Sequence, residues 1–228
     1  MVSMEKYQNI NIIYEDNHLL VVNKPANMPV CSDSSNDIDL LSKLKDYIKI
    51  KYNKPGNVYL GLIHRLDRPV EGIIVFAKTS KAAARLSNQI QNREFQKTYY
   101  AVTENKPKQK DTFIDYLIKN ENTNTSYITT ENKGKKSVLE YNLIATKNNL
   151  SLVKINLQTG RHHQIRVQFS HHGYPLYGDH KYNKNFINDN KENIALIAKE
   201  LSFYHPVTKE LLTFKIDLPK KYPYTLFF

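Results

Sequence analysis

The sequence predicts an α+β fold, in which a mostly antiparallel central sheet carries a few packed helices. Two observations support this prediction. Many short segments alternate apolar and polar residues, which is the pattern of half-buried strands. About three segments have helical spacing, and they do not alternate with strands in the rhythm of a parallel βαβ fold. The 228 residues are enough for a substantial core, and we expect a single domain over residues 1–228.

The first elements are expected to be two paired strands at residues 10–14 and 18–22, because turn-prone polar residues separate these apolar runs. A helix should follow from an N-cap at Asp39 to about Tyr52, and Pro55-Gly56 ends it. A second helix is expected to be capped by Ser80. Its buried face would comprise Ala83, Leu86 and Ile90.

Between these helices, residues 61–78 place one carboxylate, Asp67, among basic residues and directly before an apolar strand. Pro69 and Gly72 predict a turn at the start of that strand. Arginine keeps its proton in proteins, so neighbouring guanidinium groups favour an ionised Asp67 that can act as a base or nucleophile. A surface Asp–Arg pair that only fixes a loop is the alternative. The basic neighbours are His64, Arg65 and Arg68.

The second half of the chain predicts further strands at residues 95–102, 113–118, 139–145 and 153–157. Asn148-Asn149 suits a hairpin turn between the last two. The polar segments 104–111 and 119–136 are expected to be loops. Tyr99 lies in the first of these strands, where a tyrosine is most often a packing residue.

A second polar segment spans residues 157–179. Thr159-Gly160 should form a strand-to-helix turn, followed by a helix from about Arg161 to Gly173. Free N–H groups and Arg161 at its start would favour a bound phosphate. A metal site is the alternative, but adjacent His162 and His163 diverge and no cysteine lies nearby, so we expect no metal.

The whole chain carries 33 Lys+Arg against 22 Asp+Glu, a formal charge of +11. Such an excess favours a polyanionic partner, with nucleic acid first, although a general compositional bias toward lysine would give the same count. Cys31 is the only cysteine, which fits a reducing, cytoplasmic setting. No signal-like segment and no apolar run of transmembrane length occurs, so no membrane association is expected.

Two segments resemble the signatures of the RluA family of RNA pseudouridine synthases. His64-Arg65-Leu66-Asp67-Arg68, followed by Gly72, an apolar strand and Ala77-Lys78, is similar to the first. Residues 159–166 match the second, T-G-R-x-H-Q-I-R, at seven positions. Lys97, Tyr99 and Ala101 fit a third pattern, Lys-x-Tyr-x-Ala. The resemblance runs from about residue 10 to 218, and it implies a catalytic domain without a preceding S4 domain.

The resemblance implies that Asp67 is the catalytic aspartate, that Tyr99 is the active-site tyrosine and that Arg166 pairs with Asp67. It also implies an isomerase that converts uridine in ribosomal or transfer RNA to pseudouridine without a cofactor. RNA contacts are expected from His64, Arg65, Arg68 and Arg161, with Arg68 a candidate to fill the place of a flipped base.

The sequence departs from the family pattern at Glu71, where a small residue is usual. Its carboxylate could restrain Arg68 or repel a phosphate, and we favour restraint. His162 and Ile197 are smaller departures. We expect a monomer. The alternatives are an RNA-binding module without catalysis and, less supported because no carboxylate cluster is present, a nuclease.

Overall fold

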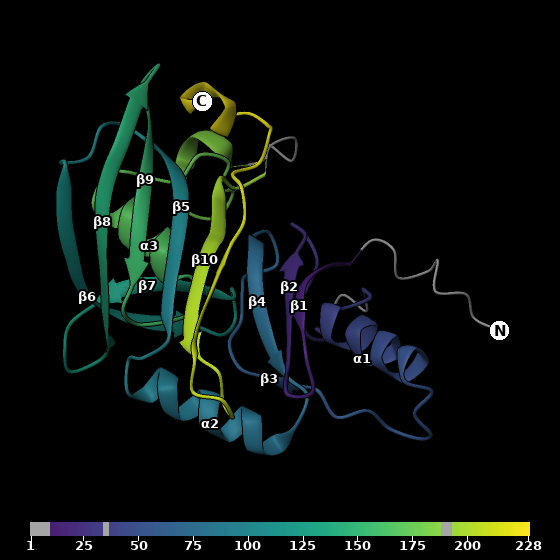
Figure 1. The fold of residues 1–228 in the computed structure, drawn as a ribbon. Coiled ribbons are helices and arrows are strands. Elements are labelled where there is room, and N and C mark those ends of the chain that lie inside the picture. Colours follow the sequence, from purple (N-terminus) through teal and green to yellow (C-terminus); the bar gives the residue numbers. More distant parts are fainter. Residues whose placement is uncertain (1–9, 34–36, 188–192) are drawn as a thin grey trace. The chain divides into compact units, whose positions relative to one another are not determined.

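The computed structural model describes residues 10–33, 37–187 and 193–228 (Figure 1). The contacts within it divide the chain into two units. Unit 1 takes in Met1–Phe95 and Glu200–Ile216, and unit 2 takes in Gln96–Lys199 and Asp217–Phe228. Strand β10 (Leu196–Tyr204) contributes to both units.

The sheet of unit 1 is antiparallel. β2 (Leu19–Lys24) pairs with β1 (Asn11–Glu15) on one side and with β4 (Glu71–Ala77) on the other. The short β3 (Gly61–Leu62) also pairs with β4. β10 (Leu196–Tyr204) enters this unit with its last five residues, which pair with β11 (Leu211–Lys215). The two strands predicted at the start of the chain are thus confirmed.

Two helices accompany this sheet. α1 (Leu40–Lys51) begins at its predicted N-cap Asp39, whose side chain accepts a hydrogen bond from the Ser42 N–H at 2.9 Å. α2 (Ser80–Gln91) is capped by Thr79, one residue before the predicted cap, because the Thr79 hydroxyl accepts from the Ala82 N–H at 3.2 Å. Side chains of α2 join those of β2, β4 and β10 in one apolar core, which comprises Leu19, Val21, Ile73, Val75, Ala77, Ala82, Leu86, Phe95, Leu201 and Phe203.

In unit 2, antiparallel strands follow one another in the order β5-β9-β8-β6-β7, and the first residues of β10, up to Lys199, also belong to this unit. Its strands are β5 (Gln96–Glu104), β6 (Lys110–Asn120), β7 (Thr125–Thr129), β8 (Lys135–Lys147) and β9 (Leu150–Leu157). Asn148 and Asn149, which both have positive φ, form the predicted turn between β8 and β9.

Strand β7 corrects the prediction of a loop over residues 119–136. Its sequence, Thr-Ser-Tyr-Ile-Thr, carries little apolar character, but its backbone pairs with β6 and the Ser126 N–H donates to the hydroxyl of Tyr182 at 2.8 Å. The polar residues around it indicated a loop, although Thr, Tyr and Ile favour strands and only four residues separate β7 from its partner β6.

The helical elements of unit 2 are α3 (Gln164–His171) and the 3₁₀ helices η2 (Lys184–Phe186) and η3 (Tyr224–Phe227). Phe169 of α3 packs against Phe113 of β6 and Tyr141 of β8, so α3 covers one face of the sheet. Mostly antiparallel strands with a few packed helices confirm the predicted α+β class. None of the helices in the described ranges has the length and hydropathy that crossing a membrane requires.

Candidate active site

Asp67 lies in a turn between β3 and β4 of unit 1, as the sequence predicts. The Val70 N–H donates to the Asp67 carbonyl at 3.0 Å and closes the turn. Gly72 has φ 129°, a value that favours glycine, and it leads the chain into the buried strand β4. The Asp67 side chain is half-buried. The turn therefore presents a carboxylate at the start of a rigid strand.

The two arginines beside Asp67 in the sequence are both exposed. The guanidinium of Arg68 binds the carboxylate of Asp37 through Nη2, and its Nη1 lies 3.9 Å from Asp33. Both acids belong to the segment before α1. Restraint of Arg68 by a carboxylate, which the sequence suggested for Glu71, is therefore supplied at least in part by Asp37.

His64 is integrated into the packing of unit 1. Its Nε2 accepts a hydrogen bond from the Val75 N–H at 3.3 Å, and its ring packs edge-on against Phe95 with 5.4 Å between centroids. The histidine thus links the turn to β4 and to the core. Its expected contact with RNA stays a prediction, as do those of Arg65 and Arg68.

Lys24, at the end of β2, is a residue of this region that the sequence analysis did not single out. It is fully buried, and its Nζ donates to the carbonyls of Pro25, Met28 and Arg68 at 2.9, 2.8 and 3.0 Å. Burial lowers the pKa of Lys24 to about 8, while the charges of Asp67 and Glu71 oppose that fall. Lys24 therefore fixes the turn and adds positive charge near Asp67. The one feature of the sequence that could have indicated Lys24 is its position between an apolar strand and a proline.

In unit 2, Tyr99 lies on β5 opposite Ile155 of β9, and it is buried. Two residues earlier on the same strand, the Nζ of Lys97 lies 3.2 Å from the point where a Cβ on Gly160 would stand. The glycine of the second signature thus leaves room for this lysine. Burial lowers the pKa of Lys97.

Arg166 lies on α3 and forms a buried bidentate ion pair with Asp179. Its Nε donates to Oδ2 at 2.8 Å and its Nη2 donates to Oδ1 at 2.7 Å. The ring of Tyr182 lies 5.1 Å from the guanidinium carbon. No role for Asp179 could be predicted, because nothing in the local sequence pattern connects it with a helix residue 13 positions earlier. The pairing of Arg166 with Asp67 stays a prediction.

The start of α3 differs from the prediction. The helix begins at Gln164, and not at about Arg161, because the Gln164 side-chain oxygen accepts from the Thr159 hydroxyl at 2.7 Å and from the Arg161 N–H at 3.0 Å. Arg161 is exposed and donates from Nε to the Lys136 carbonyl. The helix thus begins three residues later than predicted, and the expected phosphate contact of Arg161 stays a prediction.

The paired histidines of the second signature were predicted to diverge, but their rings stack with 3.7 Å between centroids, and each ring has its own hydrogen-bond partner. His163 is buried and its Nδ1 lies 2.7 Å from the Tyr182 hydroxyl, while His162 Nδ1 lies 2.8 Å from the Ser126 hydroxyl. Burial, with help from the charge of Arg166, lowers the pKa of His163 to about 2, so its ring is neutral at physiological pH. Within the described part of the chain, no three histidine, cysteine or acidic side chains are grouped in a way that could hold a metal ion.

Comparison with known proteins identifies the family. Residues 18–171, which contain Asp67, Tyr99 and Arg166, match the model of the RNA pseudouridylate synthase family. An uncharacterized RNA pseudouridine synthase of Bacillus subtilis is 33% identical over 217 residues, which cover 94% of this chain and 70% of the relative. Ribosomal large subunit pseudouridine synthase D of Zymomonas mobilis is 32% identical over 222 residues, covering 92% and 70%.

The solved structure titled human RNA pseudouridylate synthase domain containing 4 has the same fold. It aligns with a TM-score of 0.77 and 22% identity over 92% of this chain and 89% of that chain. The fold predicted from the two signatures is thereby confirmed. The chain belongs to the RNA pseudouridylate synthase family, with the RluA-type resemblance confirmed, and is an isomerase that acts on uridine in RNA.

Proposed function

We propose that this chain converts a specific uridine of ribosomal or transfer RNA to pseudouridine with Asp67 as its catalytic carboxylate and without a cofactor. The observation that carries the proposal is the place of Asp67: it is half-buried in a turn of the first signature, before a buried strand and near the ammonium group of Lys24. A carboxylate in such a position can attack the ribose or remove a proton from it.

The reaction is balanced without any co-reactant. The bond between N1 of uracil and C1′ of ribose breaks, the base turns, and C5 forms the new bond to C1′. C5 then loses its proton and N1 gains one. Substrate and product have the same atoms and the same oxidation state, so the proposed chemistry needs only acid–base or nucleophilic groups.

The remaining roles follow from the side chains. Tyr99 would stack on the uracil and take the C5 proton, and Arg166 would keep Asp67 ionised and oriented. A paired uridine would have to be flipped out, and Arg68 would fill the space it leaves. Among the relatives, some are ribosomal large subunit pseudouridine synthases, which favours ribosomal RNA as the first substrate to test. We also propose that the chain acts as a monomer in the cytoplasm.

The direct test is tritium release from RNA labelled at C5 of uridine. Ribosomal RNA and transfer RNA, each prepared from cells without this gene, are incubated with the purified chain, with and without EDTA. We expect release from one RNA class at the same rate in both conditions. Asp67→Asn should lower the rate at least about 1,000-fold, since it removes the anion and retains the shape. Glu94→Gln, at an exposed carboxylate of unit 1, is the control.

Two results would contradict the proposal. Tritium release by Asp67→Asn at the wild-type rate would remove Asp67 from the chemistry. Binding of RNA by the wild-type chain without release from either class would favour a binding module. Mapping of pseudouridine in total RNA from cells with and without the gene then identifies the uridine.

A further inference from the structure

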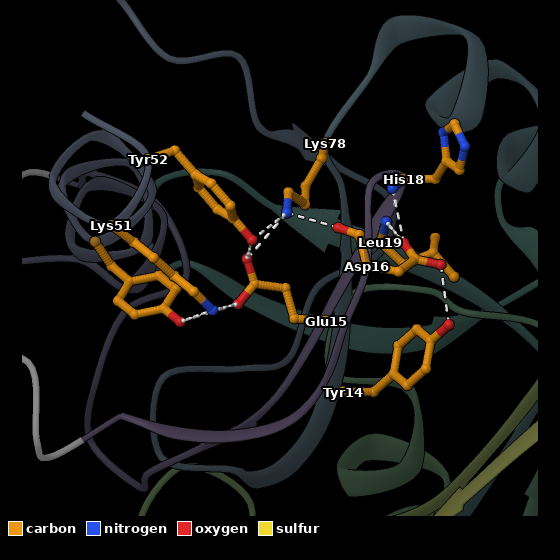
Figure 2. Close-up of polar contacts among 9 residues, drawn as sticks. Tyr14, Glu15, Asp16, His18, Leu19, Lys51, Tyr52 and Lys78 are labelled. Atoms are coloured by element: carbon orange, nitrogen blue, oxygen red, sulfur yellow. Dashed lines mark hydrogen bonds and ion pairs between the residues drawn. The ribbon is translucent and has the colours of Figure 1, made fainter. Parts of the chain in front are cut away.

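The far end of β4 from the Asp67 turn carries a polar cluster centred on Glu15. This carboxylate, at the end of β1, accepts four hydrogen bonds, from Lys51, Tyr47, Lys78 and Tyr52 (Figure 2). The donor–acceptor distances run from 2.7 to 2.9 Å. The contacts tie the C-terminal end of α1 to the sheet of unit 1.

Glu15 is an ionised anchor. Burial on its own would raise the pKa of Glu15, but the hydrogen bonds from two lysines and two tyrosines outweigh burial and lower the pKa to about 2. Two ammonium groups therefore face one carboxylate, which leaves positive charge at this place. The neighbouring Asp16 is engaged elsewhere, with its Oδ2 2.8 Å from His205 Nε2.

Tyr52, the C-cap of α1, is held by this anchor while its ring stays accessible. Its hydroxyl donates to Glu15 Oε1 at 2.7 Å, yet the residue is 45% exposed. Three ammonium groups lie around the ring, with Nζ of Lys78, Lys51 and Lys54 at 4.6, 5.5 and 6.0 Å from its centroid. An aromatic ring that is oriented in advance and surrounded by cations is suited to stacking with a nucleobase.

A purely structural role does not account for all of these groups. Lys51, Lys78 and Tyr47 already join α1 to β1 and β4 through Glu15. Lys54, in contrast, is exposed, and among the described residues no carboxylate lies within ion-pair distance of it. Its ammonium group is therefore available to a phosphate, beside an exposed ring.

We propose that Tyr52, with Lys51 and Lys54, binds a single-stranded nucleotide of the RNA substrate. The base stacks on the Tyr52 ring and the adjoining phosphates contact the two lysines. The inference rests on the proposed function, because it takes RNA as the substrate. The seven residues of β4 separate this site from the Asp67 turn by about 23 Å. The nucleotide bound at Tyr52 is therefore a different one from the uridine that reacts.

The test measures binding of a fluorescein-labelled 12-nucleotide oligouridylate by fluorescence anisotropy. Tyr52→Ala should weaken binding about 5- to 100-fold, as expected for loss of one stacked base. Tyr52→Phe keeps the ring and should stay within about threefold of wild type. Tyr204→Ala is the matched control, since Tyr204 is 43% exposed in the same unit, and it should bind as wild type does.

Lys54→Ala supplies an independent measurement that does not disturb the anchor. Loss of one phosphate contact should reduce the slope of log affinity against log salt by about 0.7, the value for single strands. Lys81→Ala, at an exposed lysine of α2, should leave the slope unchanged. If Tyr52→Ala lowers the thermal midpoint of unfolding, its loss of binding could come from unfolding. The affinity of Tyr52→Phe and the salt slope of Lys54→Ala then test the proposed binding site.

Wild-type affinity in Tyr52→Ala, an equal loss in Tyr204→Ala, or no binding of the oligouridylate by the wild-type chain would each overturn the proposal. Its failure is distinguishable from failure of the proposed function. Tyr52→Ala should raise the RNA concentration needed for half-maximal tritium release and leave release at saturating RNA unchanged, whereas Asp67→Asn should abolish release and leave oligouridylate binding intact.

Discussion

The two signature segments differ in how they contribute to the structure. In the first, Arg65 and Arg68 are exposed and Asp67 is half-buried. In the second, all residues from 163 to 169 are buried, and the charge of Arg166 is matched by the buried Asp179. The first segment presents side chains at a turn, whereas much of the second builds the interior of unit 2. A signature residue is therefore not a reactive residue until its burial and partners are known.

The local sequence explains this difference. In the first segment, Pro69 and the hydrogen bond from the Val70 N–H to the Asp67 carbonyl form a turn before β4 begins at Glu71, and this turn keeps its polar side chains near the surface. The second segment continues into α3, whose Phe169 packs against Phe113 and Tyr141. Its polar side chains are carried into the core and have to be paired there.

The largest effect on stability is expected from breaking the buried ion pair. Asp179→Ala leaves the guanidinium of Arg166 in the interior without its bidentate partner, and it should lower the free energy of unfolding by about 3 to 5 kcal/mol. Urea denaturation measures this change. Asp111→Ala removes a surface pair with Lys108 and should change stability by less than about 1 kcal/mol. A similar, small effect of both substitutions would mean that Asp179 does not hold unit 2 together.

The next effect concerns Glu15, a buried carboxylate in unit 1. Its pKa of about 2 lies below the ordinary 4.5, so its contribution to stability is complete above pH 4.5 and is lost as the pH falls toward 2. Glu15→Gln should cost up to about 3 kcal/mol at pH 7, and its difference from wild type should shrink through that window. Glu121→Gln, at an exposed ion pair with Lys119, is the control. A difference between Glu15→Gln and wild type that is constant from pH 5 to pH 2.5 would contradict the assignment.

The smallest effect is expected at the restraint on Arg68. Asp37→Asn removes one of the charges that this guanidinium faces in the free protein, while Asp33 remains 3.9 Å away, so Arg68 should be less restrained toward phosphate. Because the pair is solvent-exposed, RNA affinity should rise by no more than about fivefold. Glu71→Ser is measured beside it. A larger change in RNA affinity for Glu71→Ser than for Asp37→Asn would mean that Glu71 is the main restraint on Arg68, as the sequence suggested.

The parts of the fold that sequence predicted best are those that local chemistry determines. Asp39 caps α1 by bonding a backbone N–H three residues later, and Asn148-Asn149 forms its hairpin from its own backbone preference. The start of α3 was misplaced because the Gln164 side chain bonds back to Thr159 and Arg161 in place of a regular first turn. Strand β7 was missed because the polar residues around it indicated a loop, although its own Thr, Tyr and Ile favour a strand.

The candidate site shows the same division. Its turn and carboxylate could be predicted, since Pro69 and Gly72 lie in the motif itself. The partners of its charged residues could not, because they are distant in sequence: Lys24 bonds the carbonyl of Arg68, 44 residues away, and Arg68 binds Asp37, 31 residues before it. Pairings of this kind depend on the three-dimensional fold of the chain. The spacing of residues in the sequence does not determine them.

The central claim is that Asp67 performs chemistry while Asp179 maintains structure. One paired measurement tests it most directly: single-turnover tritium release and the urea midpoint, determined for Asp67→Asn and Asp179→Asn on the same RNA. We predict that Asp67→Asn unfolds at the wild-type midpoint and releases no tritium, and that Asp179→Asn unfolds at a lower midpoint. Wild-type release by Asp67→Asn, or a loss of release explained by its unfolding, would contradict the claim.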